Sequence, residues 1–285
     1  MDNLLVSISC TTYNHAPYFR ECLDGFLMQK CNFDFEVLIH DDASTDGTSD
    51  IIREYQAKYP KIIKPIIQEE NQWSQGIKPT WEFNFPRTKG KYIALCEGDD
   101  YWTDPLKLQK QVDFLEQNED FVGCFHNTYY ADERKGKTSE LIPWRKYDRD
   151  IFTTEDTIHT ASLFHTTSYL FRNLKIKIPL VEGVYSGDML LLGVISKYGK
   201  LKLLPDFMSV YRKNDGGITS EENIIKYHRN RIILTQFLNQ YFDYKYERKA
   251  KQILNHHKNE IFKIKYPFLF KIKELIIFRF YNLSK

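Results

Sequence analysis

The chain has 285 residues, of which 42% are hydrophobic and 15% aromatic, so it can bury a large core and is expected to fold. Its formal net charge of only +2 excludes a strong overall attraction to nucleic acid, and we expect no nucleic-acid partner. The sequence has no apolar run of about 18 residues that would span a membrane, no signal-peptide pattern at its start, and no Cys-x-x-Cys pair among its five cysteines, which together favour a reducing cytoplasm.

The first part of the chain alternates between strand and helix patterns. Short apolar runs predict strands, and apolar residues at helical spacing predict the helices between them. In chain order we expect a strand over 4–11, a helix over 17–29, a strand over 35–40, a helix over 49–59, a strand over 61–68, a less regular stretch over 69–87 and a strand over 91–97. Strands separated by helices in this way predict a parallel sheet with right-handed crossovers.

The remaining elements are shorter and less regular. In chain order we expect a helix over 105–118, a strand over 121–126, a polar and mobile excursion over 132–150, a strand over 168–171, a helix over 188–198, strands over 201–204 and 210–212, and helical segments over about 221–262. The Gly216-Gly217 pair predicts a mobile loop able to close over a ligand. We find no internal repeat and no low-complexity linker.

Three carboxylates end one of the predicted buried strands. Glu97, Asp99 and Asp100 emerge at its carboxyl end, where open α/β sheets bind their ligands. Acids this close repel one another unless a cation lies between them, and hard oxygen ligands suit Mg²⁺ or Mn²⁺. Such an ion would have open positions for phosphate oxygens. The alternative is an acidic turn before the next helix, since Pro105 suits a first helical turn.

Two more polar loops follow neighbouring predicted strands. Thr11, Tyr13 and Asn14 follow the first strand, and the Asp41-Asp42 pair follows the second. Because the carboxyl ends of parallel strands meet at one edge of a sheet, the three loops predict a single site. For the acid pair the alternative is a turn that caps the following helix.

Taken in order, these loops resemble the successive signatures of family 2 glycosyltransferases with the GT-A fold. The matching stretches are VSISCTTYN over 6–14, DDASTDGT over 41–48 and GKYIALCEGDD over 90–100. The likeness covers about the first 125 residues. It implies a Rossmann-like α/β domain with a mainly parallel sheet flanked by helices.

The resemblance also implies a division of the chain. The GT-A domain would cover residues 1–220, with a nucleotide-sugar-binding half over 1–127 and an acceptor half over 128–220. A helical and basic C-terminal extension would follow over 221–285.

Residues that match the family's motifs take roles in donor binding. Thr11 and Tyr13, with Asn14 beside them, would hold the base and ribose of a nucleotide. Asp42 would accept a hydrogen bond from the imide N–H of the base, which cytosine and adenine lack at that edge. This contact favours a UDP- or dTDP-sugar.

The acidic motif takes the role of a metal site. Asp100 would be the direct ligand of Mn²⁺ or Mg²⁺, and Asp99 would lie nearer the donor ribose or sugar while also serving the metal. The ion would neutralise the diphosphate as a leaving group. Glu97 stands where many relatives have Asp, and no role is assigned to it.

Two residues of the acceptor half complete the predicted site. Asp188 matches the family's acid at the start of a helix, and as a general base it would contribute roughly 10²–10⁴-fold. The alternative is an acid that simply suits a helix N-terminus. Arg212 would reach the diphosphate with a bidentate guanidinium. Many relatives carry His two residues later, whereas this chain has Asn214, which leaves that contact open.

Four nearby residues receive no functional role. Trp102 follows the acids, and it either lines a sugar pocket or, more often for a Trp beside a strand end, packs. His126, His159 and His165 have no spacing typical of a metal site.

The C-terminal tail is basic and amphipathic. Residues 241–285 hold eleven Lys or Arg and four Asp or Glu, a net charge of +7. Apolar residues from Phe268 to Leu283 have the spacing of one helix face. Such a segment over 264–285 predicts peripheral contact with an anionic membrane. The alternative is a helix that packs on the catalytic domain or on a second subunit of a homodimer.

The sequence therefore predicts an inverting, metal-dependent glycosyltransferase. It would move a sugar from a nucleotide-diphosphate donor to a hydroxyl of a glycan or lipid-linked acceptor, in the synthesis of a cell-surface polysaccharide or lipopolysaccharide. One alternative is a catalytically silent nucleotide-sugar-binding protein. Another is a nucleotidyltransferase of the same fold, although the basic Gly-rich phosphate loop of that class is missing after the first strand. A dehydrogenase is disfavoured because no Gly-x-Gly-x-x-Gly follows that strand.

Overall fold

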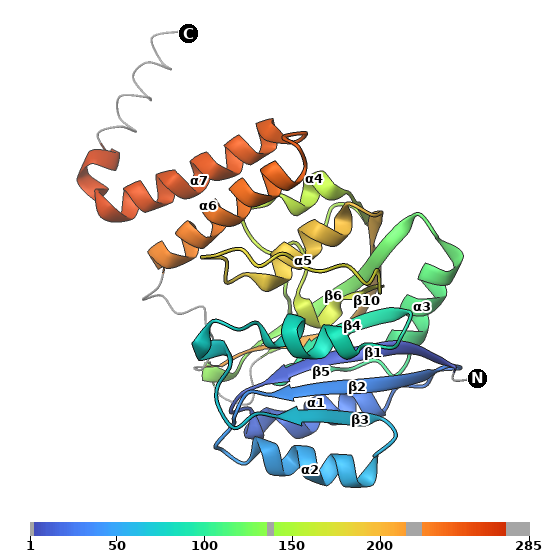
Figure 1. Ribbon diagram of the computed structural model, residues 1–285. Coiled ribbons are helices and arrows are strands. Elements are labelled where there is room, and N and C mark those ends of the chain that lie inside the picture. Colours follow the sequence, from blue (N-terminus) through green and yellow to red (C-terminus); the bar gives the residue numbers. More distant parts are fainter. Residues whose placement is uncertain (1–2, 136–139, 215–223, 272–285) are drawn as a thin grey trace. The chain divides into compact units, whose positions relative to one another are not determined.

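The computed structural model of the protein describes residues 3–135, 140–214 and 224–271 (Figure 1). The chain forms two compact units, each assembled from separate stretches of sequence. The first takes residues 1–153, 164–178 and 195–216, and the second takes 154–163, 179–194 and 217–285. The last boundary between the units falls after residue 216, and two earlier stretches also belong to the second unit. The predicted division at residue 220 stays a prediction. The Gly216-Gly217 pair lies outside the described residues.

A mixed sheet forms the first unit. Its strands run in the order β3-β2-β1-β4-β9-β6-β10-β5, with β7 on β6 and β8 on β10. Their bounds are β1 Leu4–Thr12, β2 Asp34–Asp41, β3 Ile63–Ile67, β4 Tyr92–Glu97, β5 Tyr101–Trp102, β6 Phe121–Asp132, β7 Ile142–Pro143, β8 Ile151–Phe152, β9 Leu170–Arg172 and β10 Lys200–Lys213. β1 is parallel to β2 and β4, and β2 is parallel to β3. The predicted parallel arrangement is confirmed for these four strands.

Helices α1 (Ala16–Leu27), α2 (Thr48–Lys58) and α3 (Lys107–Gln117) supply one side of the core. Side chains alternate between the faces of a strand, and Val6, Ile8 and Cys10 of β1 lie in the apolar cluster with these helices. Figure 1 shows α1 and α2 running alongside β1 to β3. The apolar face of β1 therefore holds the helices against the strands that end in the candidate site.

The other face of β1 is polar and buried, since Ser7 and Ser9 are at most 3% exposed. Asn84, at the end of the short helix η2 (Thr80–Asn84), donates from Nδ2 to Ser9 Oγ at 3.0 Å and to the Cys10 carbonyl at 3.1 Å. Arg87, in η3 (Phe85–Arg87), donates to the carbonyl of Ile39 at 2.7 Å. The less regular stretch predicted over 69–87 thus covers the polar side of β1 and satisfies some of the buried polar groups of β1 and β2.

The second half of the sheet differs from the prediction. β9 runs antiparallel to both β4 and β6, and β10 is one strand where two short ones were predicted. The pairing of β10 with β6 shifts register around Pro205-Asp206, which interrupts the alternation of apolar residues there. β6 continues to Asp132, six residues beyond its predicted end at His126. The polar stretch after it is partly ordered, because β7 pairs with β6.

The second unit is helical. It contains α4 (Thr154–Thr157), most of α5 (Gly187–Ser196), α6 (Ile224–Tyr241) and α7 (Glu247–Lys265). α6 and α7 are joined by a turn in which Asp243 and Tyr244 have positive φ angles of 51° and 60°. Within 3–135, 140–214 and 224–271 no helix has the length and apolarity needed to cross a membrane. Residues 272–285 of the predicted amphipathic tail lie outside the described part.

Candidate active site at the strand ends

Backbone hydrogen bonds join the three polar loops at the carboxyl ends of β1, β2 and β4. The amide of Gly98 donates to the Thr11 carbonyl at 2.9 Å, and the amide of Asp42 donates to the Thr12 carbonyl at 3.0 Å. A Cβ at Gly98 would lie 2.6 Å from Thr12 Oγ1, so only glycine permits this close approach. The loops predicted to form one site are therefore adjacent.

The loop after β1 is shaped by Asn14. Its φ of 54° lies in the left-handed region, which Asn tolerates better than most residues. Its amide donates to Ser44 Oγ at 2.9 Å, and its Oδ1 accepts from the Thr45 amide at 2.8 Å. Tyr13 beside it is 46% exposed. Asn14 thus fixes the loop, while the Tyr13 ring is accessible to a ligand.

Asp41 and the residues after it tie the turn to the start of α2. The carboxylate of Asp41 accepts hydrogen bonds from the hydroxyls of Ser44 and Ser49, the latter in the first turn of α2. Asp46 accepts from the Thr48 amide at 3.0 Å and from the Ala16 amide, at the start of α1, at 2.9 Å. Asp41 thus fixes the turn that leads into α2 without capping it, since the N-cap residue Gly47 has no side-chain cap. Asp46 joins the starts of α1 and α2.

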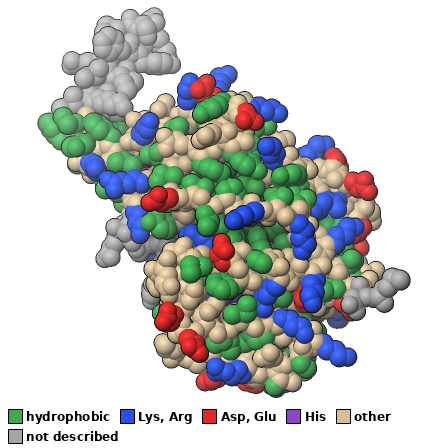
Figure 2. Space-filling model, viewed as in Figure 1, with side chains coloured by type: hydrophobic (Ala, Val, Ile, Leu, Met, Phe, Trp, Pro, Cys, Tyr) green, Lys and Arg blue, Asp and Glu red, His purple; other side chains and the backbone are tan. Residues whose placement is uncertain are grey.

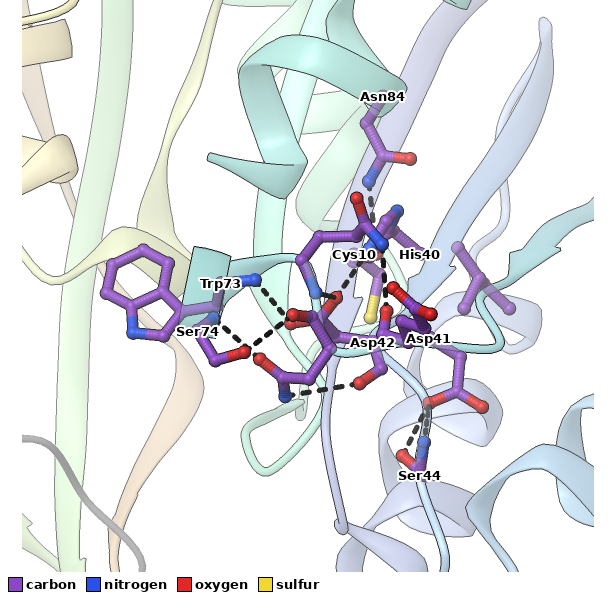
Figure 3. Close-up of polar contacts among 12 residues, drawn as sticks. Cys10, His40, Asp41, Asp42, Ser44, Trp73, Ser74 and Asn84 are labelled. Atoms are coloured by element: carbon purple, nitrogen blue, oxygen red, sulfur yellow. Dashed lines mark hydrogen bonds and ion pairs between the residues drawn. The ribbon is translucent and has the colours of Figure 1, made fainter. Parts of the chain in front are cut away.

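Asp42 holds a different loop (Figure 3). Its carboxylate accepts from the amides of Gln72 at 2.8 Å and Trp73 at 3.0 Å, and its Oδ1 lies 3.3 Å from His40 Nε2. Burial lowers the pKa of His40, so a neutral imidazole faces the carboxylate. The predicted base-binding acid thus also anchors the loop around Trp73 to the end of β2.

Asp100 is buried at the end of β4. It is 1% exposed, and its Oδ1 accepts from the Arg212 amide at 2.9 Å. Burial, followed by repulsion from Asp99, raises its pKa well above the ordinary value of a carboxyl. Its Oδ2 lies 3.7 Å from His165 Nδ1, and burial lowers the pKa of His165 to about 3. Both groups are therefore pushed toward their uncharged forms.

Asp99 is held from two sides. Its Oδ2 accepts from Asn214 Nδ2 at 2.9 Å and lies 3.9 Å from His15 Nε2. Asn214, at the position where the resemblance led us to look for His, thus contacts the acidic motif through its amide. The main-chain carbonyl of Asp99 accepts from Arg212 Nη1 at 2.9 Å.

The guanidinium of Arg212 lies among carboxylates. Its side chain is 5% exposed, pairs with Glu21, and brings Nε within 3.4 Å of Glu133. Its centre also lies 4.1 Å from the centroid of the Tyr101 ring. A contact between Arg212 and a diphosphate would compete with these partners. In the structure Arg212 also bonds to the acidic motif, through its own amide to Asp100 and from Nη1 to the Asp99 carbonyl. Its predicted contact with a diphosphate stays a prediction.

The donor set at this point suits a divalent cation completed by a substrate. Mg²⁺ in particular is often bound through one or two carboxylates together with substrate phosphates. Asp99 and Asp100 supply the carboxylates, and neutral His165 lies beside them. No cluster of three or more Cys, His, Asp or Glu suited to holding a metal occurs within the described ranges. The assignment of Asp99 and Asp100 as metal ligands stays a prediction.

Asp188 belongs to the second unit. It lies in the first turn of α5, and its carboxylate accepts a hydrogen bond from Ser162 Oγ. Next to it, Ser186 Oγ donates to Asn230 Oδ1 at 2.6 Å, which ties the start of α5 to α6. The helix start predicted for Asp188 is confirmed, whereas its role as base stays a prediction.

Several residues near the acids were not predicted from the sequence. His165 was given no role, yet β9 and the turn before it bring its ring to Asp100. Glu21, Glu133 and His15 also face this site, and no local motif marks them. For Trp102 the structure confirms packing, because its indole is 2% exposed and donates to the Thr167 carbonyl at 3.0 Å.

Comparison with known proteins decides the family. The sequence profile described as Glycosyl transferase family 2 matches residues 7–176, more than half of the chain. The chain belongs to this family. The matched region includes both aspartate pairs and the three loops at the carboxyl ends of β1, β2 and β4.

Curated relatives agree with this assignment. An uncharacterised protein of Mycobacterium tuberculosis is 39% identical over 215 residues, covering 75% of this chain and 60% of that protein. This chain therefore spans about three fifths of the length of such relatives. An uncharacterised glycosyltransferase of Methanocaldococcus jannaschii is 27% identical over 74% of this chain and 72% of its own. TuaG of Bacillus subtilis, a putative teichuronic acid biosynthesis glycosyltransferase, is 34% identical over 39% of this chain and 42% of its own.

Solved structures identify the fold. S. aureus TarS 1-349 in complex with UDP-GlcNAc superposes with a TM-score of 0.63 at 20% identity, covering 91% of this chain and 73% of that one. The mannosyltransferase PcManGT from Pyrobaculum calidifontis, in complex with GDP-Man and Mn²⁺, superposes with a TM-score of 0.55 at 20% identity. The match covers 90% of this chain and 69% of that one. The predicted GT-A fold is confirmed.

Proposed function

We propose that this family member transfers a sugar from a nucleotide-diphosphate donor to a hydroxyl of a glycan or lipid-linked acceptor, with inversion at the anomeric carbon and with Mn²⁺ or Mg²⁺ as cofactor. The observation that carries the proposal is the Asp99-Asp100 pair, held at the sheet edge beside the loops after β1 and β2. The UDP-GlcNAc bound to TarS and the GDP-Man and Mn²⁺ bound to PcManGT support such a donor and cofactor.

The nucleotide would lie over the loops after β1 and β2. In this proposal Thr11 and the exposed ring of Tyr13 hold the base and ribose, with Asn14 setting the shape of their loop. Asp42 accepts the imide N–H of uracil or thymine, which favours a UDP- or dTDP-sugar. The loop that Asp42 already anchors brings Trp73, which is 37% exposed, to the same edge.

The acids would divide the chemistry between them. Asp100 and Asp99 hold the divalent ion, which when bound neutralises the diphosphate as it leaves. Asp188 takes the proton from the acceptor hydroxyl, since direct displacement requires a base and no protein nucleophile. Arg212 positions the acidic motif through the Arg212 amide and the Asp99 carbonyl.

The test is calorimetric binding of UDP, dTDP, GDP and CDP to the wild type and to Asp100→Asn, each with and without Mn²⁺. We expect UDP or dTDP to bind more tightly with Mn²⁺ and the variant to lose that gain. Asp104→Asn serves as the matched control, because Asp104 lies four residues later and pairs with Lys110 at 2.7 Å. If no nucleotide binds to the wild type under either condition, the proposal fails.

The alternatives differ in their products. A silent binding protein would bind the nucleotide and release none from any nucleotide-sugar in the presence of acceptors. A nucleotidyltransferase would release pyrophosphate from a nucleoside triphosphate and a sugar phosphate. Inversion is read directly by NMR of the anomeric proton in the product glycoside.

The setting we propose is the cytoplasmic face of a membrane, in surface-polysaccharide or lipopolysaccharide synthesis, and the likeness to TuaG supports it. Apolar side chains gather at the end of α7 (Figure 2). Phe268 is 74% exposed and Leu269 is 52% exposed, with Lys265 and Lys271 nearby. Lysines beside exposed apolar residues suit an anionic bilayer surface.

Truncation tests this contact. Removal of residues 264–285 should abolish sedimentation with vesicles of phosphatidylglycerol and phosphatidylcholine, and unchanged sedimentation would contradict it. Light scattering on both forms tests the homodimer alternative, in which the truncation would instead convert a dimer to a monomer.

A further inference from the structure

A cavity of about 620 Å³ opens on the first unit beside β6 and β10. One wall is formed by residues 143–150, and the other by Asn127 of β6 and by side chains between Lys202 and Phe207 of β10. This volume lies within the range of about 300–1,000 Å³ that is typical of ligand sites. None of the donor-site residues described above lines this cavity.

The walls of the cavity are basic. Arg145, Lys146, Arg149 and Lys202 face two carboxylates, Asp148 and Asp150, so the lining carries a net charge of +2. Asp150 is paired with Lys202, and Asp148, 93% exposed at its side chain, lies 4.0 Å from Arg149 Nε. A charge equal to that of the whole chain is thus concentrated on one small cavity, which favours an anionic ligand.

The basic wall is anchored. The Trp144 amide donates to the Thr128 carbonyl at 2.9 Å, and the Leu203 amide donates to the Asp150 carbonyl at 2.7 Å. Between these points the Tyr147 ring packs 5.9 Å from the ring centroid of Phe125. The segment predicted to be mobile is therefore held at both ends over 144–150, and its arginines are presented from a fixed backbone.

An aromatic surface forms the opposite wall. Phe207 lines the cavity and stacks on Tyr129 with ring centroids 4.3 Å apart and planes at 23°. Both rings are partly exposed. The flat apolar face of an aromatic ring suits the C–H face of a sugar, while cations beside it suit phosphate or carboxylate groups.

A chain of contacts links the cavity to the acidic motif. The Arg145 guanidinium lies 5.0 Å from the Trp144 ring centroid, and that ring lies 5.7 Å from the ring of His165. His165 Nδ1 is 3.7 Å from Asp100 Oδ2. All of these residues belong to the first unit. A saccharide seated in the cavity would thus lie a few side chains away from the proposed site of transfer.

We propose that this cavity binds an acidic saccharide, one that carries a phosphate or carboxylate group, as part of the acceptor. The inference rests on the proposed function and names the class of its acceptor. The anionic group pairs with Arg145, Lys146 and Arg149, and a neighbouring sugar ring packs on Phe207.

Binding of small probes tests the proposal. Saturation-transfer NMR and calorimetry would compare trigalacturonic acid, glucose 6-phosphate and maltotriose as carboxylate, phosphate and neutral probes. We expect one or both anionic probes to bind at least tenfold more tightly than maltotriose, and their affinity to fall as salt is raised. The better anionic probe identifies the acidic group. Equal binding of maltotriose, or binding of none of the three, would overturn the proposal.

Variants locate the binding. Lys146→Glu reverses the charge of an exposed side chain, and we expect it to weaken binding of the anionic probe at least tenfold. The pair Arg145→Gln and Arg149→Gln should abolish binding, and the corresponding pair of lysine substitutions should restore part of it. Lys61→Glu, an exposed lysine elsewhere in the unit, is the matched control. Probe binding that survives Lys146→Glu and the glutamine pair would contradict the proposal.

The donor site provides an independent readout. UDP binding in the presence of Mn²⁺ should be unchanged in all these cavity variants. If UDP fails to bind even to the wild type, the proposed function fails while the affinity of the cavity for acids is still measured. If UDP binds and the anionic probes do not, only the acceptor inference fails.

Discussion

Two pairs of adjacent aspartates follow parallel strands of the same sheet, yet their surroundings differ. Asp41 and Asp42, after β2, accept hydrogen bonds from serine hydroxyls and from the amides of Gln72 and Trp73. Asp99 and Asp100, after β4, accept fewer hydrogen bonds from the described residues, and burial beside Asp99 raises the pKa of Asp100. The first pair is satisfied by protein donors, whereas the second retains charge repulsion that a cation would relieve.

The same Asp-Asp dipeptide thus has two different surroundings in one sheet, and each suits a different role. Carboxylates surrounded by donors fix loops, and the loops held by Asp41 and Asp42 are those proposed to bind the nucleotide. Carboxylates placed together with few donors favour binding of a positive charge. Substitution of one acid in each pair should therefore affect different properties of the protein.

The largest expected effect is on sugar transfer. Asp100→Asn should reduce turnover by about 10³-fold or more, because the proposed metal would contribute several kcal/mol of charge stabilisation and each 1.36 kcal/mol is tenfold in rate. Its melting temperature should not fall, since a neutral amide suits a buried site where the carboxyl pKa is raised. Asp41→Asn should instead cost about 1.5–3 kcal/mol of stability through weakened bonds to a charged group. Turnover assays and thermal unfolding of both variants measure these effects. A loss of stability in Asp100→Asn together with a larger loss of turnover in Asp41→Asn would contradict the assignment of the two pairs.

A third acid, Asp188, begins a helix and does not end a strand. Asp188→Asn should lower turnover by roughly 10²–10⁴-fold if it is the base, with the KM for the donor unchanged. Steady-state kinetics measures both quantities. Ser162→Ala removes the hydroxyl that donates to Asp188 and should change turnover by less than about tenfold. A large rise in donor KM in Asp188→Asn would argue for a binding role instead.

The position of the second pair depends on Arg212. Arg212→Lys keeps the charge but loses the planar fork, so the backbone of the acidic motif should loosen. We expect a loss of about 10–100-fold in Mn²⁺ affinity, measured by titration in the presence of UDP. Arg134→Lys is the matched control, because Arg134 also binds a carboxylate, that of Asp132, through two bonds of 2.9 Å. An equal loss of Mn²⁺ affinity in both variants would show that Arg212 has no special role.

The last expected effect changes only the pH dependence of stability and concerns a buried base near the acidic loop. Lys107 is 0% exposed, lies 3.9 Å from the Trp102 ring centroid, and has its pKa lowered by burial from 10.5 to about 7. Between these two pH values the unfolded chain binds the proton more tightly, so the stability contribution of Lys107 rises as pH increases from about 7 toward 10.5.

Lys107→Met should flatten this rise by at most about 1.4 kcal/mol per pH unit. Urea unfolding of wild type and variant between pH 7 and pH 10 measures the difference in slope. Lys61→Met, at an exposed position, should leave the slope unchanged. Parallel slopes in wild type and Lys107→Met would show that Lys107 stays charged in the folded protein.

Much of the donor half could be predicted because its signals are local. Alternating apolar residues over 4–11 and 35–40 specify strands, and the loops after them carry motifs short enough to recognise. The order of strands and helices then leaves few topologies, since crossovers between parallel strands are right-handed. The sheet edge where Thr11, Asp42 and Asp99 meet follows from these rules alone.

The second half depended on pairings between distant residues. The antiparallel insertion of β9 carries His165 to Asp100, and no spacing in the sequence indicates that neighbour. The bulge at Pro205-Asp206 hides the continuity of β10, because it interrupts the period on which strand prediction relies. The partners of Arg212 come from α1 and from the end of β6, far away along the chain.

The sequence by itself determined the family, the fold of the donor half and the acids at its edge, since each rests on a contiguous pattern. Only the tertiary structure decided which of those acids are satisfied by the protein, because donors arrive from other elements and burial is a property of the packed molecule. For the same reason only the structure revealed the basic cavity. Its charged residues come from two segments that lie far apart in the sequence, residues 145–150 and Lys202 of β10.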